Sequence, residues 1–274
     1  MRILLVGDVV GRAGRAVLAE NLPELRQAWR LDFVIVNGEN AAGGFGITER
    51  ICADFLAAGA DCVTLGNHAF DQREALVFIG RERRLIPPLN YPRGTPGCGA
   101  NVFEAASGAR VLVVSLTGRV FMDAMDDPFA AIEREVSACP LGVGCDALVV
   151  DFHAEASSEK QAFAHFVDGR VSFVAGTHTH VPSADHQILP NGTAFATDAG
   201  MTGDYDSVIG MDKEEPVRRF TTKLPAARFE PASGAATLCG IAVELDAKGL
   251  AAKIGPVRIG GRLSQARPEF WEAT

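Results

Sequence analysis

Five short apolar segments of this chain are each followed at once by a side chain that can bind a metal ion. Segments of this kind predict buried β-strands. In an open α/β sheet the carboxyl ends of the strands share one edge, and ligands bind outside it, so we expect these side chains to meet there. In chain order they are Asp8 after ILLVG, Glu39 and Asn40 after FVIVNG, Asn67 and His68 after CVTLG, His153 after LVVDF, and His178 with His180 after FVAGT.

These side chains offer oxygen and imidazole ligands, which suit divalent iron, manganese, cobalt or zinc. The six cysteines form no CxxC pair, and we interpret them as reduced thiols outside the metal site. Asp8 alone would be read as a helix cap, and His153 alone as a buried core histidine. Residues 39–40 and 67–68 alone would be read as turns. Their shared position after strands favours a metal-centred enzyme over these separate interpretations.

Familiar nucleotide-binding and hydrolase motifs are absent from the sequence. The opening GDVVGRAG places Gly7, Gly11 and Gly14 four and three residues apart, which matches neither GxxxxGK[ST] nor GxGxxG. The chain also lacks a GxSxG nucleophile elbow and an HExxH zinc motif. The metal-ligand pattern is therefore the main indication of chemistry.

Up to residue 175 the chain alternates between strand-like segments and segments with helical periodicity. Thr48 is expected to cap one helix, Asp71 with Glu74 to form a capping box for the next, and Ser158 with Gln161 to do so for a later one. Strands are expected over 2–7, 33–36, 62–65, 111–116, 147–150 and 171–175. Helices are expected over 15–29, 48–58 and 71–79, and after Pro128 and Ser158.

From His186 onward, short strand-like runs joined by tight turns predict an antiparallel second layer, with a helix over 212–219. A chain of 274 residues that is 47% hydrophobic can bury a large core, and no linker divides it. The expected fold is an α/β protein, a multi-layer α/β/β/α sandwich, built as a single domain over residues 1–274.

The formal net charge of −8 argues against an extended nucleic-acid surface or an anionic-membrane surface, because either would require a basic face. The apolar opening, MRILLVGDVV, is too short to span a membrane and lacks a small-residue cleavage site, so we expect a cytoplasmic protein. The sequence leaves a homo-oligomer open.

Pro and Gly are dense between residues 87 and 101, which predicts a long irregular loop that walls the site. Tyr91 in this loop and Phe121 could stack on a nucleobase, although packing within the protein is the favoured interpretation. His165 and His186 follow no strand and are interpreted as structural. Three acidic residues near the predicted ligand loops are interpreted as turn or supporting residues: Glu155, Asp198 and Asp204.

The order of these residues resembles the calcineurin-like metallophosphoesterases, whose GD…GD…GNH…H…HxH pattern binds two metals. The resemblance covers residues 1–182, and TDAGMTGDYDSVIGM resembles a later segment of the YmdB-type branch. Two departures stand out: Val10 replaces the histidine of the usual Asp-x-His, and Glu39 replaces the bridging aspartate. Both look characteristic of the YmdB-type branch, which narrows the resemblance to that branch.

The resemblance implies two divalent or mixed-valence metal ions per chain, with iron as the native metal and manganese as a substitute in vitro. It implies that Glu39 bridges the two ions and that His68 is the catalytic proton donor. The implied ligands are Asp8, Asn40 and His180 for the first ion, and Asn67, His153 and His178 for the second.

The implied reaction is hydrolysis of a small phosphodiester, in particular a 2′,3′-cyclic nucleotide, by attack of a metal-bridged hydroxide. His68 would protonate the leaving alkoxide. Two alternatives stay open at this point. The missing histidine favours a regulatory protein that binds metal and nucleotide with little turnover, and a phosphomonoesterase is the other alternative.

Overall fold

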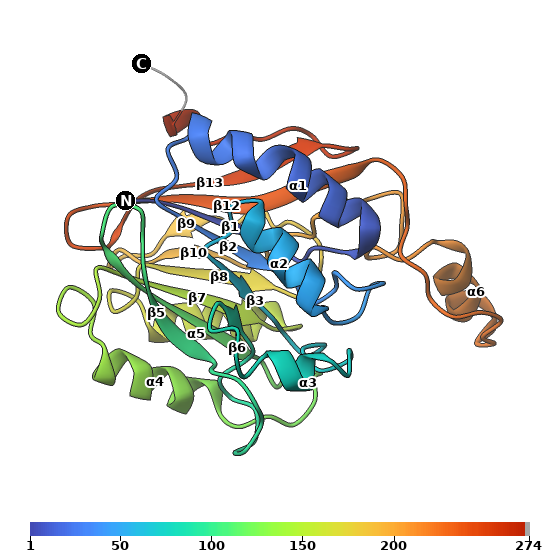
Figure 1. The fold of residues 1–274 in the computed structure, drawn as a ribbon, viewed down its shortest axis with the longest axis horizontal. Coiled ribbons are helices and arrows are strands. Elements are labelled where there is room, and N and C mark those ends of the chain that lie inside the picture. Colours follow the sequence, from blue (N-terminus) through green and yellow to red (C-terminus); the bar gives the residue numbers. More distant parts are fainter. Residues whose placement is uncertain (272–274) are drawn as a thin grey trace.

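The computed structural model describes residues 1–271, in which two β-sheets pack face to face between two layers of helices (Figure 1). One apolar core lies between the two sheets, and a further core lies between each sheet and its helices. The predicted α/β/β/α sandwich is therefore confirmed.

Within residues 1–271 the first sheet has the strand order β11-β12-β1-β2-β3-β4, with β13 paired to β12. Strands β1 to β4 are parallel, and β12 runs antiparallel to β1. The strands are β1 (Arg2–Val6), β2 (Phe33–Asn37), β3 (Cys62–Thr64), β4 (Leu85–Ile86), β11 (Gly203–Asp204), β12 (Ala236–Leu245) and β13 (Ala251–Gly260). The outer face is covered by α1 (Gly11–Ala28), α2 (Glu49–Ala57) and α3 (Ala75–Phe78).

The second sheet, in the same part of the chain, has the order β5-β6-β7-β8-β10-β9. Strands β6, β7, β8 and β10 are parallel, and the two edge strands are antiparallel to their neighbours. These strands are β5 (Ala100–Glu104), β6 (Arg110–Thr117), β7 (Ala147–His153), β8 (Phe173–Thr177), β9 (Gln187–Ile188) and β10 (Ala194–Ala196). Its outer face is covered by α4 (Pro128–Ala138) and α5 (Ser157–Phe166).

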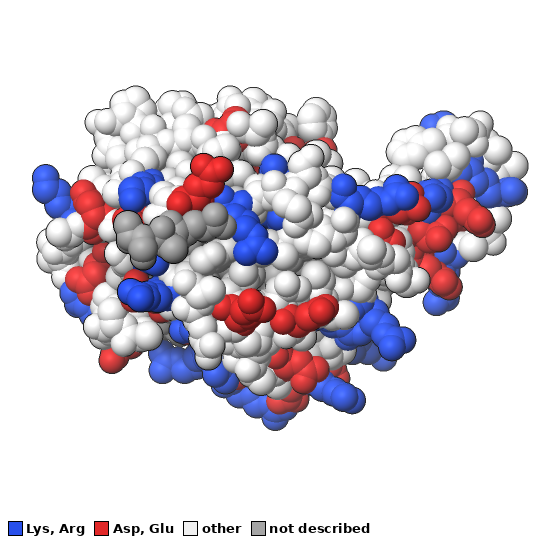
Figure 2. All heavy atoms as spheres, turned by 90° about the horizontal axis from the view of Figure 1, so that it is seen from above, with Lys and Arg blue, Asp and Glu red and all other residues white. Residues whose placement is uncertain are grey.

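Two further elements lie outside the four layers. Helix α6 (Glu214–Thr222) projects from the body together with the loop after it, and we call residues 214–229 the arm (Figures 1 and 2). A short 3-10 helix, η1 (Glu269–Trp271), ends the described chain. On the face in Figure 2, Lys and Arg side chains are interspersed with Asp and Glu. Among the helices of residues 1–271, none combines the length and apolar character needed to cross a membrane.

The continuous apolar character of the strands follows from burial on both faces. In β1, Ile3 and Leu5 point into the core between the sheets, whereas Leu4 and Val6 pack against the helices. Successive side chains of a strand point to opposite faces, so a strand covered on both sides must be apolar at every position. This is why segments such as ILLV carry no polar alternation.

The prediction that the C-terminal strands form an antiparallel second layer is wrong. Strands β12 and β13 extend the first sheet, β9 and β10 join the second, and β10 runs parallel to β8. The second sheet instead begins with β5, in the middle of the chain. A strand that is buried on both faces has the same apolar pattern in either sheet, so the pattern does not reveal where the chain crosses between sheets.

Thr48 caps α2 as predicted, because its hydroxyl accepts a hydrogen bond from a backbone N–H of the first turn. The capping box of Asp71 and Glu74 is wrong, because α3 begins only at residue 75 and has no side-chain cap. Asp71 instead contacts His68, with 2.8 Å between Oδ2 and Nδ1. The box predicted at Ser158 is also wrong, because α5 begins one residue earlier without a side-chain cap.

Candidate metal centre

The strand-end side chains do converge, at the carboxyl ends of strands from both sheets. The loops after β1, β2 and β3 come from the first sheet, whereas His153 ends β7 and His178 follows β8 in the second. The expectation of one sheet edge is therefore wrong in this detail. Because the two sheets pack face to face, their loops meet over the core between them.

The faces that the two sheets turn toward each other are apolar along most of their length, and they become polar at the end where these side chains converge. Asp151 in β7 lies on that face, fully buried, and burial raises the pKa of its carboxyl. It accepts hydrogen bonds from Asn37 Nδ2 (2.9 Å), Thr64 Oγ1 (2.5 Å) and Thr177 Oγ1 (2.6 Å). These bonds tie β7 to β2, β3 and β8 beneath the site. Our prediction missed Asp151, although a carboxylate within the apolar run LVVDF requires such partners.

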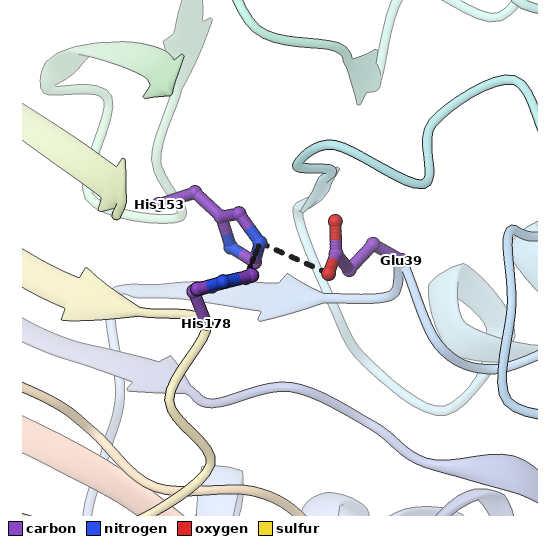
Figure 3. A group of neighbouring side chains, drawn as sticks. All are labelled: Glu39, His153 and His178. Carbon is purple, nitrogen blue, oxygen red and sulfur yellow. Dashed lines mark hydrogen bonds and ion pairs between the residues drawn. The ribbon is translucent and has the colours of Figure 1, made fainter. Parts of the chain in front are cut away.

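Asp151 also sets the orientation of the fully buried His153. His153 Nδ1 lies 2.9 Å from Thr177 Oγ1, and that hydroxyl donates its own hydrogen to Asp151. Nδ1 must therefore carry the ring hydrogen, which leaves Nε2 facing the site. Nε2 lies 3.0 Å from Glu39 Oε1, from Asn67 Oδ1 and from His178 Nδ1. Figure 3 shows Glu39, His153 and His178 pointing toward one another.

This first cluster, Glu39, Asn67, His153 and His178, gathers lone pairs that require a positive charge among them. Burial would raise the pKa of Glu39, but the charge and hydrogen bond of His153 lower it to about 2. Burial would lower the pKa of His153, but Glu39 raises it to about 9. A proton on His153 thus pairs with Glu39, and a metal ion can take that proton's place. One ligand atom each of Glu39, His153 and His178 lie within 4.8 Å of one another.

The second cluster consists of Asp8, Asn40 and His180. His180 Nδ1 donates to the carbonyl of Ile209 at 2.8 Å, and Asn40 Nδ2 donates to Gly44 O at 3.0 Å. His180 Nε2 and Asn40 Oδ1, both acceptors, therefore face each other at 3.2 Å. Asp8 Oδ1 lies 3.9 Å from His180 Nε2 and has no hydrogen-bond partner among residues 1–271, although Asp8 is fully buried. Three acceptors around one point fit a cation.

Burial also shifts the pKa of one residue in each cluster, Asp8 and His178. It raises the pKa of Asp8 to about 6, against the charges of His180 and His153. It lowers the pKa of His178 to about 3, with the charge of His153 acting in the same direction. His178 Nε2, on the side away from His153, lies 3.2 Å from Glu155 Oε2. Glu155 is thus a supporting residue that orients His178, in line with its interpretation.

The loop that carries His178 and His180 is held in a strained conformation. Both residues have positive φ, 96° and 66°, which costs energy for a residue with a side chain. Between them, Thr179 donates to Asp198 Oδ2 from its backbone N–H (3.0 Å) and its hydroxyl (2.7 Å). Lys160 from α5 donates to the same oxygen at 2.8 Å. Asp198 is thus a supporting residue, and Lys160 is one that the sequence pattern gave no means to find.

His68 lies beside the clusters but is not one of the groups that crowd His153. Its Nδ1 lies 2.8 Å from Asp71 Oδ2, and its backbone N–H donates to Glu39 Oε2 at 3.2 Å. Its ring meets Phe45 edge to face, with 5.1 Å between centroids. The side chain lines a cavity next to the site, together with Phe45. This position separates the side chain of His68 from that of Asn67, its neighbour in sequence, although both residues lie in the turn after β3.

The other residues considered in the sequence analysis belong to neither cluster. Asp204 accepts from the backbone N–H groups of residues 206 and 234, as a turn residue does. His165 is an exposed residue of α5. The irregular loop does border the site, because Tyr91 donates from its hydroxyl to the carbonyl of Asn67 at 3.3 Å. Tyr91 also packs edge to face on Phe70, so it supports the loop.

Comparison with known proteins supports the resemblance over most of the chain. The family model described as "YmdB-like protein" matches residues 4–257. The chain is 46% identical over 246 residues to the "2',3'-cyclic-nucleotide 2'-phosphodiesterase" of Bacillus subtilis (strain 168), covering 90% of this chain and 92% of that protein.

Two solved structures are similar throughout. A hypothetical protein from Thermus thermophilus is 42% identical with a TM-score of 0.89, and the match covers 96% of this chain and all of that one (100%). A novel phosphatase from Mycoplasma pneumoniae is 33% identical with a TM-score of 0.87, covering 100% of this chain and 97% of that one. The predicted resemblance and fold are thus confirmed.

Proposed function

The chain belongs to the YmdB-like family, and on that basis we propose that it is a dinuclear metal phosphodiesterase that hydrolyses 2′,3′-cyclic nucleotides. The observation that carries the proposal is the pair of acceptor clusters around His153 Nε2 and His180 Nε2. The name of the Bacillus subtilis relative supports the choice of substrate.

Each cluster supplies the donors for one ion. Glu39, whose carboxylate contacts His153 and the backbone of His68, would be the ligand shared by the two ions. The donors are oxygen and imidazole groups, which suit several divalent metals. The choice of iron as the native metal, with manganese as a substitute, follows from the resemblance to the YmdB-type branch. The second cluster, Asp8, Asn40 and His180, would hold one ion, and Asn67, His153 and His178 of the first cluster would hold the other.

The ligand set leaves a positive surplus for an anionic substrate. Two divalent ions carry a charge of about +4, and the carboxylates of Asp8 and Glu39 offset about −2 of it. When bound, such a pair of ions stabilises charge on the phosphoryl oxygens and provides a nucleophile from water near neutral pH. The surplus attracts a phosphodiester, which bears one negative charge.

His68 is the residue of this chain that protonates the leaving alkoxide. Asp71 accepts from Nδ1 of His68, so the ring can offer a proton from Nε2 while its orientation stays fixed. The ring lines the cavity that adjoins the clusters, where a substrate can reach it. A histidine that served as a metal ligand could not carry a transferable proton on the coordinating nitrogen.

The test is hydrolysis of a 2′,3′-cyclic nucleotide, bis-p-nitrophenyl phosphate and p-nitrophenyl phosphate by protein purified without chelator, with element analysis of the same sample. We expect two ions per chain, with iron most abundant, and metal-dependent turnover of the two diesters. Nucleotide binding without turnover would instead identify a regulatory protein. Preference for the monoester would identify a phosphomonoesterase.

A further inference from the structure

A cavity of about 320 Å³ lies between the metal centre and the arm. Its polar end consists of side chains already placed at the site, namely Glu39, Asn40, His68, His178 and His180. Its other end consists of seven apolar side chains from two loops and the arm. These are Phe45, Val208, Ile209, Met211, Pro216, Phe220 and Phe229.

The apolar end is joined directly to the metal centre. The carbonyl of Ile209 accepts the Nδ1 hydrogen bond of His180, so the wall of the cavity and a predicted metal ligand are in contact. The volume is at the lower end of the range of small-molecule sites, which is about 300–1,000 Å³. A mononucleotide fits such a cavity, whereas a structured nucleic acid does not.

The arm presents its aromatic side chains on a braced surface. Pro216 and Phe220 are four residues apart and share one face of α6. The guanidinium of Arg219 lies 4.0 Å from the ring centroid of Phe229, and it is fixed by Glu215 at 2.7 Å and by the carbonyl of Ala227 at 2.6 Å. Phe220 lines the cavity while 75% of it is exposed to solvent. An aromatic face is therefore available to a ligand.

We propose that this apolar end is the nucleobase subsite, in which the base stacks on Phe220 and Phe229 while the cyclic phosphate lies at the metal centre. The inference rests on the proposed function and extends it to substrate recognition. Aromatic stacking suits any of the bases, because each has a π-face. None of the seven apolar side chains can read a base edge by a strong hydrogen bond. The enzyme therefore accepts purine and pyrimidine cyclic nucleotides alike.

Phe121 is the other exposed aromatic side chain near the metal centre on which a base could stack. It is 89% exposed and, with Met122, lines a second hollow on the other side of Asn67 and His178. That hollow also contains the carboxylate of Asp123 and is more polar in its lining. A base in that hollow would lie beside Asp123 with only Phe121 and Met122 as apolar contacts, whereas seven apolar side chains form the arm end of the first cavity. The arm side of the metal centre is thus the better fit for the base.

The experiment compares Phe220→Ala with the wild type on two substrates that differ only in the base. One is 2′,3′-cyclic AMP, and the other is the 2′,3′-cyclic phosphate of 1-O-methyl ribose, which has no base. We expect Phe220→Ala to lower kcat/KM for cyclic AMP about 5- to 140-fold, mainly through KM. Activity on the abasic substrate should change little. Phe220→Trp should retain most of the selectivity, and the four common 2′,3′-cyclic nucleotides should be hydrolysed at similar kcat/KM.

Val217→Ala is the matched control, because Val217 is an exposed residue of α6 that does not line the cavity. Equal losses on both substrates, no loss on either, or a selective loss in Phe121→Ala in place of Phe220→Ala would overturn the subsite. Strong discrimination among the four bases would overturn it as well. If the wild type hydrolysed neither substrate, the proposed function itself would be contradicted, so the two failures are distinguishable.

Discussion

The ammonium of Lys160 lies 2.8 Å from the carboxylate of Asp198, and both side chains are withdrawn from solvent. The same carboxylate holds Thr179 by two hydrogen bonds, and Thr179 separates two histidines of the metal centre. A buried charge is costly unless it is paired and hydrogen-bonded, so this arrangement requires every one of its partners. The ion pair therefore links the stability of the fold to the geometry of the site.

Asp198→Asn should destabilise the protein, because it leaves the ammonium of Lys160 buried without a counter-charge. The loss in the free energy of unfolding should be about 3–5 kcal/mol, measured by denaturant titration. Metal content per chain should fall too, as the loop that carries His178 and His180 loses its anchor. Glu133→Gln, which removes an exposed ion pair with Arg170, is the control and should change neither quantity appreciably. Wild-type stability and metal content in Asp198→Asn would contradict the anchoring role.

Glu39→Ala should lose both ions, since Glu39 is the carboxylate proposed to lie between them. Element analysis of the purified variant measures this directly. Glu155→Gln is the comparison, because Glu155 contacts His178 from the outer side and is 49% exposed at its side chain. That variant should keep both ions. Two ions per chain in Glu39→Ala would rule out the bridging role.

His68→Ala should lower kcat about 10²- to 10⁴-fold, the usual contribution of general acid catalysis, and leave the metal content intact. Asp71→Asn should lower kcat less, because it removes only the group that orients the ring. Both effects should be smaller on bis-p-nitrophenyl phosphate, whose leaving group needs little protonation. Loss of metal from His68→Ala would assign His68 to the ligands and refute the donor role.

The sequence predicted which side chains come together better than it predicted the topology, for physical reasons. Asp8, His153 and His178 lie close together, as expected, because each stands at or just after the end of an apolar strand, and the carboxyl ends of packed parallel strands collect at one end of a domain. The distribution of strands between two sheets was not predictable, because β1 and β7 are both buried on their two faces, whichever sheet they belong to. The local sequence pattern of a strand does not reveal which other strand it will pair with.

Some of the residues that support the site could be predicted from the sequence, and others could not. Asp151 could have been found, since an acid inside a buried strand must have partners. Lys160 could not, because a lysine in KQAFAHF reads as a solvated helix residue until the burial of α5 is known. Asp71 was assigned to a helix cap because its spacing to Glu74 fits a capping box. Its contact with His68 instead depends on where the chain turns after β3.

Gly66→Ala should prevent metal binding, because a Cβ at this position would collide with the carboxylate of Glu39 and the ring of His153. The carboxylate of Glu39 accepts a hydrogen bond from the backbone of His68, and the ring of His153 is hydrogen-bonded to Thr177. Neither side chain can therefore move aside without breaking these contacts. We expect metal content well below that of the wild type and a lower Tm. Gly80→Ala is the matched control, since a Cβ there meets no atom within 4 Å. Full metal occupancy in Gly66→Ala would show that the ligand cluster is looser than the contacts around His153 imply.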